Sequence, residues 1–309
     1  MVDMDVYMSD EIVSLNKSDL NGLETVGGFY VKKKRKNKID KCNICGKESY
    51  LTWDDVPPKF CFNDGRVKYN SMMEFHEHSK KSLSQNGIRY RTLCDDCNNR
   101  LLGVEYDKEY KILVDTLYNL YTRTGEISQY VVIHGLKINR VARAIVGHLL
   151  AAREDFFDGK SEIELRKFVL NPNILPPKNM RLLYYVYTYN TVMIVRDFFP
   201  MKLGNMDYKV PRCLMSCLNT FPLAFILADE CDDTCGLYDM FELCTSNIDD
   251  EVDIKIDILS YLFPNQKIRR HPYWPCNVSD NEDGVSAVLT SEVAHNDSVI
   301  SDARNLKKR

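Results

Sequence analysis

Two cysteine pairs of the form Cys-x-x-Cys constrain this chain more than any other feature. Cys42 and Cys45 form the first pair, Cys94 and Cys97 form the second, and 48 residues separate them. Each pair presents two thiolates on a tight turn, so that four sulfurs can surround one zinc ion tetrahedrally. The surrounding sequence is turn-rich and too polar to bury a core of its own. We therefore expect a closed, structural zinc site; four unrelated buried cysteines are the alternative.

Composition supports thiols that stay reduced. The chain has 309 residues and 11 cysteines, an odd number in a chain too large to need a disulfide framework. Its first ten residues are acidic and carry no apolar run behind a basic cluster, and no stretch of about 18 apolar residues is present. These features predict a cytoplasmic protein without a secretory signal or a membrane span.

Charge is strongly segregated, although the net charge is only −3. Residues 1–28 contain six acids and one lysine, whereas residues 29–47 contain eight bases and one acid. Such a basic block can pair with nucleic-acid phosphates. A solvated arm is the alternative interpretation. The candidate phosphate-binding residues of this block are Lys32, Lys33, Lys34, Arg35 and Lys36.

Hydrophobic periodicity predicts a helical middle and a β-rich C-terminal part. Apolar residues recur at helical spacing over 105–123 and 138–153, and Ser161 with Glu164 is typical of a capping box opening a third helix to about Phe168. Strands are expected over 182–189, 191–196 and 252–259, with at most two short ones in 29–104. The chain is thus predicted to be α+β. Its expected divisions are an acidic lead 1–28, a zinc domain 29–125, a helical segment 126–178, a β-rich accessory domain 179–276 and a flexible tail 277–309.

The sequence around the cysteine pairs resembles that of the HNH, or ββα-metal, nuclease family. The resemblance rests on "LTWDDVPPK" after the first pair and on "CDDCNNRLLGVEYD", which begins with the second pair. It implies a zinc-stabilised, treble-clef-like ββα domain in which Asp54 and Asn98 bind a catalytic Mg²⁺ or Mn²⁺ ion. Asp55 then stands at the position of the general base, where the family has histidine.

Aspartate at position 55 is the departure from the family pattern. The ordinary pKa of aspartate is about 3.9, against about 6.5 for histidine, so it is a much weaker base. Loss of general-base assistance costs about 10²- to 10⁴-fold in rate. Three explanations remain open: an inactivated variant, a natural pseudo-nuclease, and an enzyme that takes its base from elsewhere, such as His76 or His78.

Further polar residues are candidates for backbone contacts or for buried positions. We expect Lys59 and Arg100 to contact nucleic-acid phosphates, and Lys80, Lys81, Arg89 and Arg91 are weaker candidates in a segment that otherwise reads as a surface loop. Cys213, Cys217, Cys231 and Cys235 lack the two-residue gap of a zinc site and are interpreted as core residues, with a second zinc site as the alternative. Cys61 and Cys276 are expected to be buried or incidental thiols, and His148 a hydrogen-bonded core histidine.

The resemblance implies a metal-dependent DNA endonuclease, weakened or inactive in this form because of Asp55. The resemblance implies a setting in restriction or phage defence. A non-catalytic, zinc-stabilised module for DNA binding or assembly is the alternative, as is a zinc-binding transcription or antitoxin factor. The C-terminal domain is a candidate site for a partner protein or an activating signal, and the oligomeric state stays open.

Overall fold

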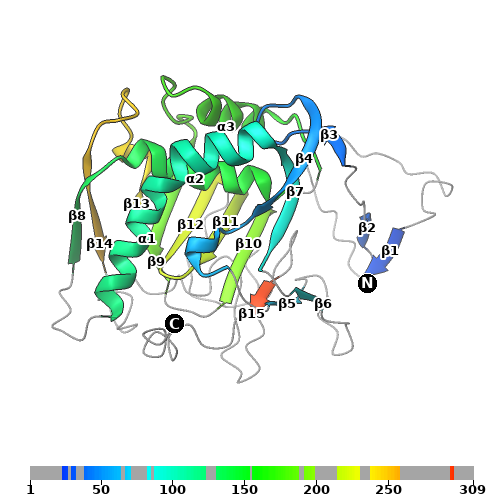
Figure 1. Cartoon of the computed structure of the whole chain (residues 1–309), viewed down its shortest axis with the longest axis horizontal. Coiled ribbons are helices and arrows are strands. Elements are labelled where there is room, and N and C mark those ends of the chain that lie inside the picture. Colours follow the sequence, from blue (N-terminus) through cyan, green and yellow to red (C-terminus); the bar gives the residue numbers. More distant parts are fainter. Residues whose placement is uncertain are drawn as a thin grey trace, which may run out of the picture. The chain divides into compact units, whose positions relative to one another are not determined.

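The structure is a computed structural model, shown in Figure 1, in which the chain forms two compact units, residues 1–35 and 36–309. It describes residues 23–26, 29–32, 38–63, 67–70, 82–84, 87–122, 130–153, 155–187, 191–198, 214–229, 237–257 and 293–295. In the first unit, β1 (Leu23–Val26) and β2 (Phe29–Lys32) pair as an antiparallel hairpin. Part of the expected acidic lead is therefore a strand.

The second unit begins with a three-stranded antiparallel sheet that carries both cysteine pairs. Its strands are β3 (Ile39–Lys41), β4 (Glu48–Asp55) and β7 (Arg89–Cys94), in the order β3-β4-β7. The first cysteine pair occupies the tight turn between β3 and β4. After β7 the chain enters a wide, π-type helix, η3 (Asp96–Tyr106), which holds Cys97. The expectation of at most two strands in 29–104 is wrong, because short strands rich in charged residues leave little apolar signal.

Three helices follow, close to their predicted positions. They are α1 (Asp107–Thr122), α2 (Ile138–Ala151) and α3 (Lys160–Leu170). Helix α2 is buried along almost its whole length. A side chain at Gly147 would place its Cβ 2.4 Å from a methyl carbon of Leu102, so a larger residue where α2 crosses η3 would require Leu102 to move. The capping box predicted at Ser161 is absent, because α3 begins after Gly159 and no side chain caps it.

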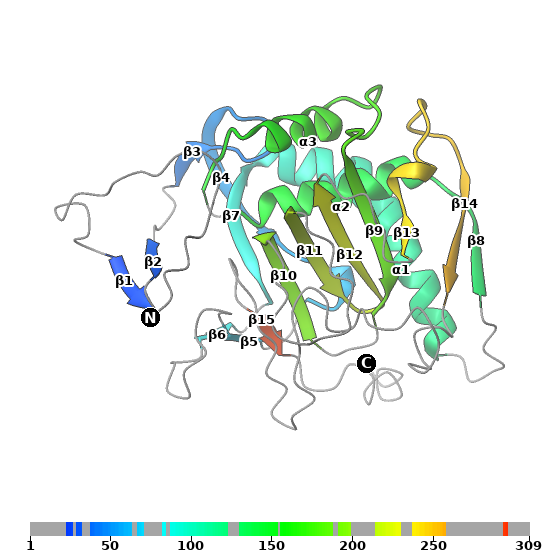
Figure 2. The same cartoon turned by 180° about the vertical axis from the view of Figure 1, so that it is seen from behind.

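A large antiparallel sheet forms the second layer. Figures 1 and 2, seen from opposite sides, show α1 and α2 on one face of its central strands. The strand order is β13-β9-β12-β11-β10-β15-β5-β6. The strands are β5 (Val67–Asn70), β6 (Ser82–Ser84), β9 (Met180–Val186), β10 (Thr191–Phe198), β11 (Leu214–Thr220), β12 (Leu223–Asp229), β13 (Tyr238–Asp239) and β15 (Val293–His295). Strand β15 lies within residues 277–309, which were expected to form a flexible tail. That expectation is therefore wrong for residues 293–295.

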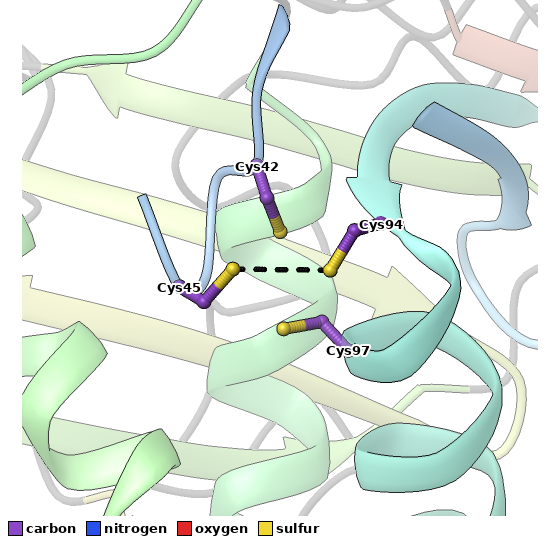
Figure 3. Close-up of side chains that lie close together, drawn as sticks. All are labelled: Cys42, Cys45, Cys94 and Cys97. Atoms are coloured by element: carbon purple, nitrogen blue, oxygen red, sulfur yellow. Dashed lines mark hydrogen bonds between the residues drawn. The ribbon is translucent and has the colours of Figure 1, made fainter. Parts of the chain in front are cut away.

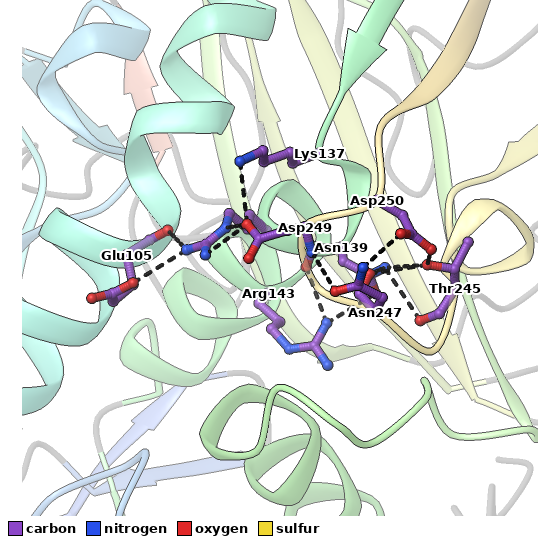
Figure 4. A network of polar contacts seen from close by, with 9 residues as sticks. Glu105, Lys137, Asn139, Arg143, Thr245, Asn247, Asp249 and Asp250 are labelled. Carbon is purple, nitrogen blue, oxygen red and sulfur yellow. Dashed lines mark hydrogen bonds and ion pairs between the residues drawn. The ribbon is translucent and has the colours of Figure 1, made fainter.

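A separate two-stranded ribbon pairs β8 (Tyr130–Leu136) with β14 (Val252–Asp257). Two short 3-10 turns, η2 (Lys59–Cys61) and η4 (Phe241–Leu243), complete the described elements. The loop before β14 is tied to α2 by the polar network of Figure 4. In that network Asn139 donates to the carbonyl of Asn247 at 3.0 Å, while Arg140 binds Asp249 and the backbone carbonyl of Glu105. These contacts join η3, α2 and the ribbon.

A single apolar core runs from the cysteine-bearing sheet to the large sheet. Leu51 of β4, Ile145 of α2 and Phe225 of β12 all belong to it. The second unit is therefore mixed helix and antiparallel sheet, organised around α2. Among the described residues, no helix combines the length and the apolar character needed to cross a membrane.

Candidate functional site

The four cysteines predicted to bind zinc converge on one point. As Figure 3 shows, Cys42 and Cys45 come from the turn before β4, while Cys94 ends β7 and Cys97 lies in η3. All four sulfur atoms lie within 4.8 Å of one another, and the Sγ atoms of Cys45 and Cys94 are 3.8 Å apart. Zn–S bonds of about 2.3 Å in a tetrahedron require sulfur separations of about 3.8 Å. The cluster thus fits a metal ion such as structural zinc.

The cysteine cluster also receives the C-terminal end of α2. The last carbonyl groups of a helix have no partner within the helix, so they need donors from elsewhere. The Asn43 amide, inside the first cysteine pair, donates to the carbonyl oxygens of Leu150 at 2.9 Å and Arg153 at 2.6 Å. The Thr92 hydroxyl donates to the carbonyl of Ala151 at 2.6 Å. Metal binding and the docking of α2 are therefore linked structurally.

A β-bulge in β7 lies opposite the strand that carries the two aspartates. Thr52 pairs with Leu93 and Asp54 with Tyr90, so two residues of β7 face the single residue Trp53. Asn98 of η3 donates its amide to the Trp53 carbonyl at 3.0 Å and to the Thr52 hydroxyl at 3.0 Å. Asn98 therefore lies beside the Asp54–Asp55 pair, and its amide oxygen is not used by either bond.

The two adjacent aspartates point to opposite faces, as neighbouring strand residues do. Asp54 turns inward and its side chain is 7% exposed. Its Oδ2 atom lies 3.3 Å from Nδ1 of His148, and Nε2 of the same histidine lies 3.0 Å from Oδ1 of Asp107. Carboxylates only accept hydrogen bonds, so His148 satisfies both by carrying a proton on each ring nitrogen. The result is a buried Asp54–His148–Asp107 bridge between β4, α2 and α1.

Charge and burial compete in this bridge. Burial by itself lowers the pKa of His148, but Asp107 and Asp54 overcome that effect and raise the pKa to about 10. Burial raises the pKa of Asp54, against the opposing charge of His148. At neutral pH His148 is therefore a cation that neutralises part of the charge of the two carboxylates.

Asp55 is partly buried and pairs with two cations. Its Oδ1 atom lies 2.8 Å from Nε of Arg89, and its Oδ2 atom 3.8 Å from Nζ of Lys59. Beside it, the Arg91 guanidinium lies over the indole ring of Trp53, 5.3 Å from the ring centroid. We use the name β4–β7 outer face for five residues. Trp53 and Asp55 lie in β4, Arg89 and Arg91 lie in β7, and Lys59 lies in the turn η2 that follows β4.

The carboxylates of the site predicted for Mg²⁺ or Mn²⁺ are paired with protein cations. These ions require several oxygen ligands that converge on one point. Here Asp54 is buried against an imidazolium, whereas Asp55 lies on the other face and is paired with protein cations. Within the described residues, the cysteine cluster is the group of Cys, His and acidic side chains whose ligand atoms lie close enough to share a metal.

Other sequence predictions are resolved only in part. Arg100 is exposed and paired with Asp96, Cys61 is buried as expected, and Cys217 is a buried residue of β11. His148 is confirmed as a hydrogen-bonded core histidine. Lys32 lies in β2, and the structure does not describe its side chain. Several candidates fall outside the described residues: Lys33, Lys34, Arg35, Lys36, His76, His78, Lys80, Lys81, Cys213, Cys231, Cys235 and Cys276.

Sequence reasoning missed the partner of His148. A polar side chain in a helix as apolar as α2 signals a buried hydrogen bond, but it does not identify the acceptor.

Comparison with protein-family models, with curated proteins and with solved structures finds no match for this chain.

Proposed function

We propose that this chain is a zinc-stabilised nucleic-acid-binding protein, related in its local sequence to HNH nucleases, and that it does not hydrolyse DNA in this form. The observation that supports binding is the β4–β7 outer face, where Arg91 lies over an exposed aromatic ring and two further cations pair with Asp55. Proteins that bind nucleic acids combine such cations, which contact phosphates, with aromatic rings, which contact bases. Because the cysteine cluster needs free thiols, a reducing compartment such as the cytoplasm is part of the proposal.

The charge of this face favours a polyanion. Lys59, Arg89 and Arg91 contribute three positive charges and Asp55 one negative charge, which leaves a net charge of +2. Lys59 is well exposed and Arg89 partly so. The basic residues Lys32 to Lys36 would add further phosphate contacts. Binding of this kind weakens steeply with salt, because each phosphate contact releases counterions.

The way in which the two carboxylates are held supports the proposed absence of hydrolysis. The carboxylate of Asp54 is paired with His148. Asp55 is a weak base, and its carboxylate is paired with Arg89 and Lys59. Neither is available to bind a metal or to take a proton from water. The setting in restriction or phage defence that the resemblance implies stays part of the proposal, with recognition rather than cleavage as the role of this chain.

Asp55→Asn is expected to strengthen DNA binding. The substitution removes the carboxylate that holds Arg89 and Lys59 and leaves both cations for phosphates. One charge pair at 4 Å in water is worth about 1 kcal/mol, so affinity should rise about fivefold at low salt. Fluorescence anisotropy with labelled DNA across a salt series measures this change. The slope of log K against log salt should steepen by up to about one unit.

Asp253→Asn is the matched control, because it removes the same charge from the β8–β14 ribbon, where Asp253 pairs with His134. It should leave the affinity unchanged. Equal affinities for the natural protein and Asp55→Asn would show that the β4–β7 outer face does not contact phosphates. Undetectable binding by the natural protein at low salt would contradict the proposed function itself.

Metal-dependent cleavage is the second candidate function, and the position of Asn98 favours it. Asn98 is 44 residues from Asp54 in sequence, yet its amide binds the carbonyl of the residue just before Asp54. That proximity is what a nuclease of the HNH type requires of these residues. On this hypothesis, the scaffold lacks only the base at position 55.

Asp55→His separates the two candidates. Our proposal predicts no cleavage of plasmid DNA with Mg²⁺ or Mn²⁺, since His148 still holds Asp54. The nuclease hypothesis predicts a gain of about 10²- to 10⁴-fold over the natural protein. Asp55→His combined with Asn98→Ala is the control for contaminating nucleases. Cleavage that appears with the first variant and disappears with the second would replace our proposal by the nuclease hypothesis.

A further inference from the structure

Trp53 is the most unusual side chain of the β4–β7 outer face. Tryptophan is normally well buried in folded proteins, yet Trp53 is 56% exposed. Its backbone is held in place, because it pairs with the bulged part of β7 and its carbonyl accepts the amide of Asn98. A large apolar ring is thus held at the surface, next to the cations of the same face.

Arg91 determines how the ring is presented. Its guanidinium lies over the indole ring, 5.3 Å from the centroid, so one face of the ring is covered by a planar cation. The exposed part of the ring remains accessible to a second flat group. A guanidinium stacked on an aromatic ring is also a favourable neighbour for phosphate, because Arg can donate to it while remaining stacked.

We propose that Trp53 stacks on an unpaired base of a single-stranded nucleic acid whose backbone phosphates contact Arg91, Arg89 and Lys59. This inference rests on the proposed function, and it names the class of nucleic acid. In a duplex the faces of the bases are covered by their neighbours, so a ring on an outer sheet surface reaches them only in a single strand. Stacking on an aromatic side chain works for every base, because every base has a π-face.

The spacing of the face agrees with this arrangement. Trp53 and Asp55 are two residues apart on β4, which places them about 7 Å apart along an extended strand and on the same side of it. Arg89 and Lys59 gather around Asp55, so the base contact and the phosphate contacts lie next to each other. The cations complement the phosphate charge and the ring complements the base, which favours a nucleic acid over a protein partner.

The test compares Trp53→Ala with the natural protein on a labelled oligothymidylate and on a duplex of the same length, at one fixed salt concentration. Affinity for the single strand should fall about 5- to 150-fold, the range that corresponds to one stacked base. Affinity for the duplex should not change. Trp53→Phe should retain part of the single-strand affinity, because it keeps an aromatic face. Tyr50→Ala, which removes another exposed aromatic residue of β4, is the matched control and should have no effect.

A second readout reports directly on the ring. The chain contains two tryptophans, so Trp274→Phe leaves Trp53 as the only indole fluorophore. Its emission should be quenched by the oligothymidylate and not by the duplex. If Trp53→Ala binds the single strand as well as the natural protein does, or if the emission is unchanged on binding, the inference is wrong while the proposed function stands. If the natural protein binds neither nucleic acid, both fail.

Discussion

Removal of the metal is expected to unfold the cysteine-bearing sheet and to release the C-terminal end of α2. Structural zinc contributes about 10–16 kcal/mol of apparent binding free energy in small zinc domains, which is folding free energy there. Here Cys42 and Cys45 lie in one turn, whereas Cys94 ends β7 and Cys97 lies in η3, so the ion would add a strong link to the pairing of β4 with β7. Asn43 and Thr92, which bind the last carbonyls of α2, stand directly next to these ligands.

Three measurements check this expectation. Metal analysis should find one zinc ion per chain. A chelator, or Cys94→Ser, should lower the melting temperature strongly and should increase amide exchange at the end of α2. Cys244→Ser is the matched control, because Cys244 is a partly buried thiol outside the cluster, and it should retain the zinc. A metal-free protein with native exchange in α2 would contradict the link between the metal and the helix.

The parts of the fold that the sequence predicted are those encoded locally. Two residues separate the cysteines of each pair, so the geometry of a turn alone presents the sulfurs together, and the cluster is present as predicted. Helices α1 and α2 have a clear 3.6-residue period, and both occur at nearly the predicted bounds. The strands of the 29–104 region were underestimated because each is short and carries charged residues.

The orientation of the two aspartates could not be predicted, because the alternation of buried and exposed residues along β4 is interrupted. In a regular strand, Leu51, Trp53 and Asp55 would share one face, and burial of Leu51 would turn Asp55 inward. In the structure the register of β4 with β7 shifts between Thr52 and Asp54, and there Trp53 is exposed and Asp54 is buried. The partner of Asp54 is equally hidden, since His148 is 94 residues away in sequence and nothing local connects them. Pairings of this kind are set by tertiary packing.

The Asp54–His148–Asp107 bridge leads to the second large prediction, which is that His148→Gln destabilises the protein strongly. Glutamine removes the positive charge and leaves two buried or half-buried carboxylates facing each other across α2. Breaking a buried ion pair by removing one partner costs about 3–5 kcal/mol, because the remaining charge is uncompensated. Urea unfolding at pH 7 measures this loss. His134→Gln, which removes a histidine from an exposed pair on the ribbon, should have little effect.

The same bridge predicts how stability depends on pH. The pKa of His148 is raised from 6.5 to about 10 in the folded protein, so its stabilising contribution is complete below about pH 6.5 and is lost as the pH rises towards 10. The free energy of unfolding of the natural protein should therefore decline over this window. A natural protein whose stability is constant from pH 7 to 10 would show that His148 is not the cation of the bridge.

A double variant identifies the interaction responsible. If the charge left on Asp54 causes the loss in His148→Gln, then adding Asp54→Asn removes that charge and should recover part of the stability. The alkaline decline should also become shallower, because the cation and one carboxylate are both gone. If the two substitutions simply added their costs, Asp54 and His148 would not be coupled. Asp54 would then be free to act as the metal ligand that the nuclease hypothesis requires.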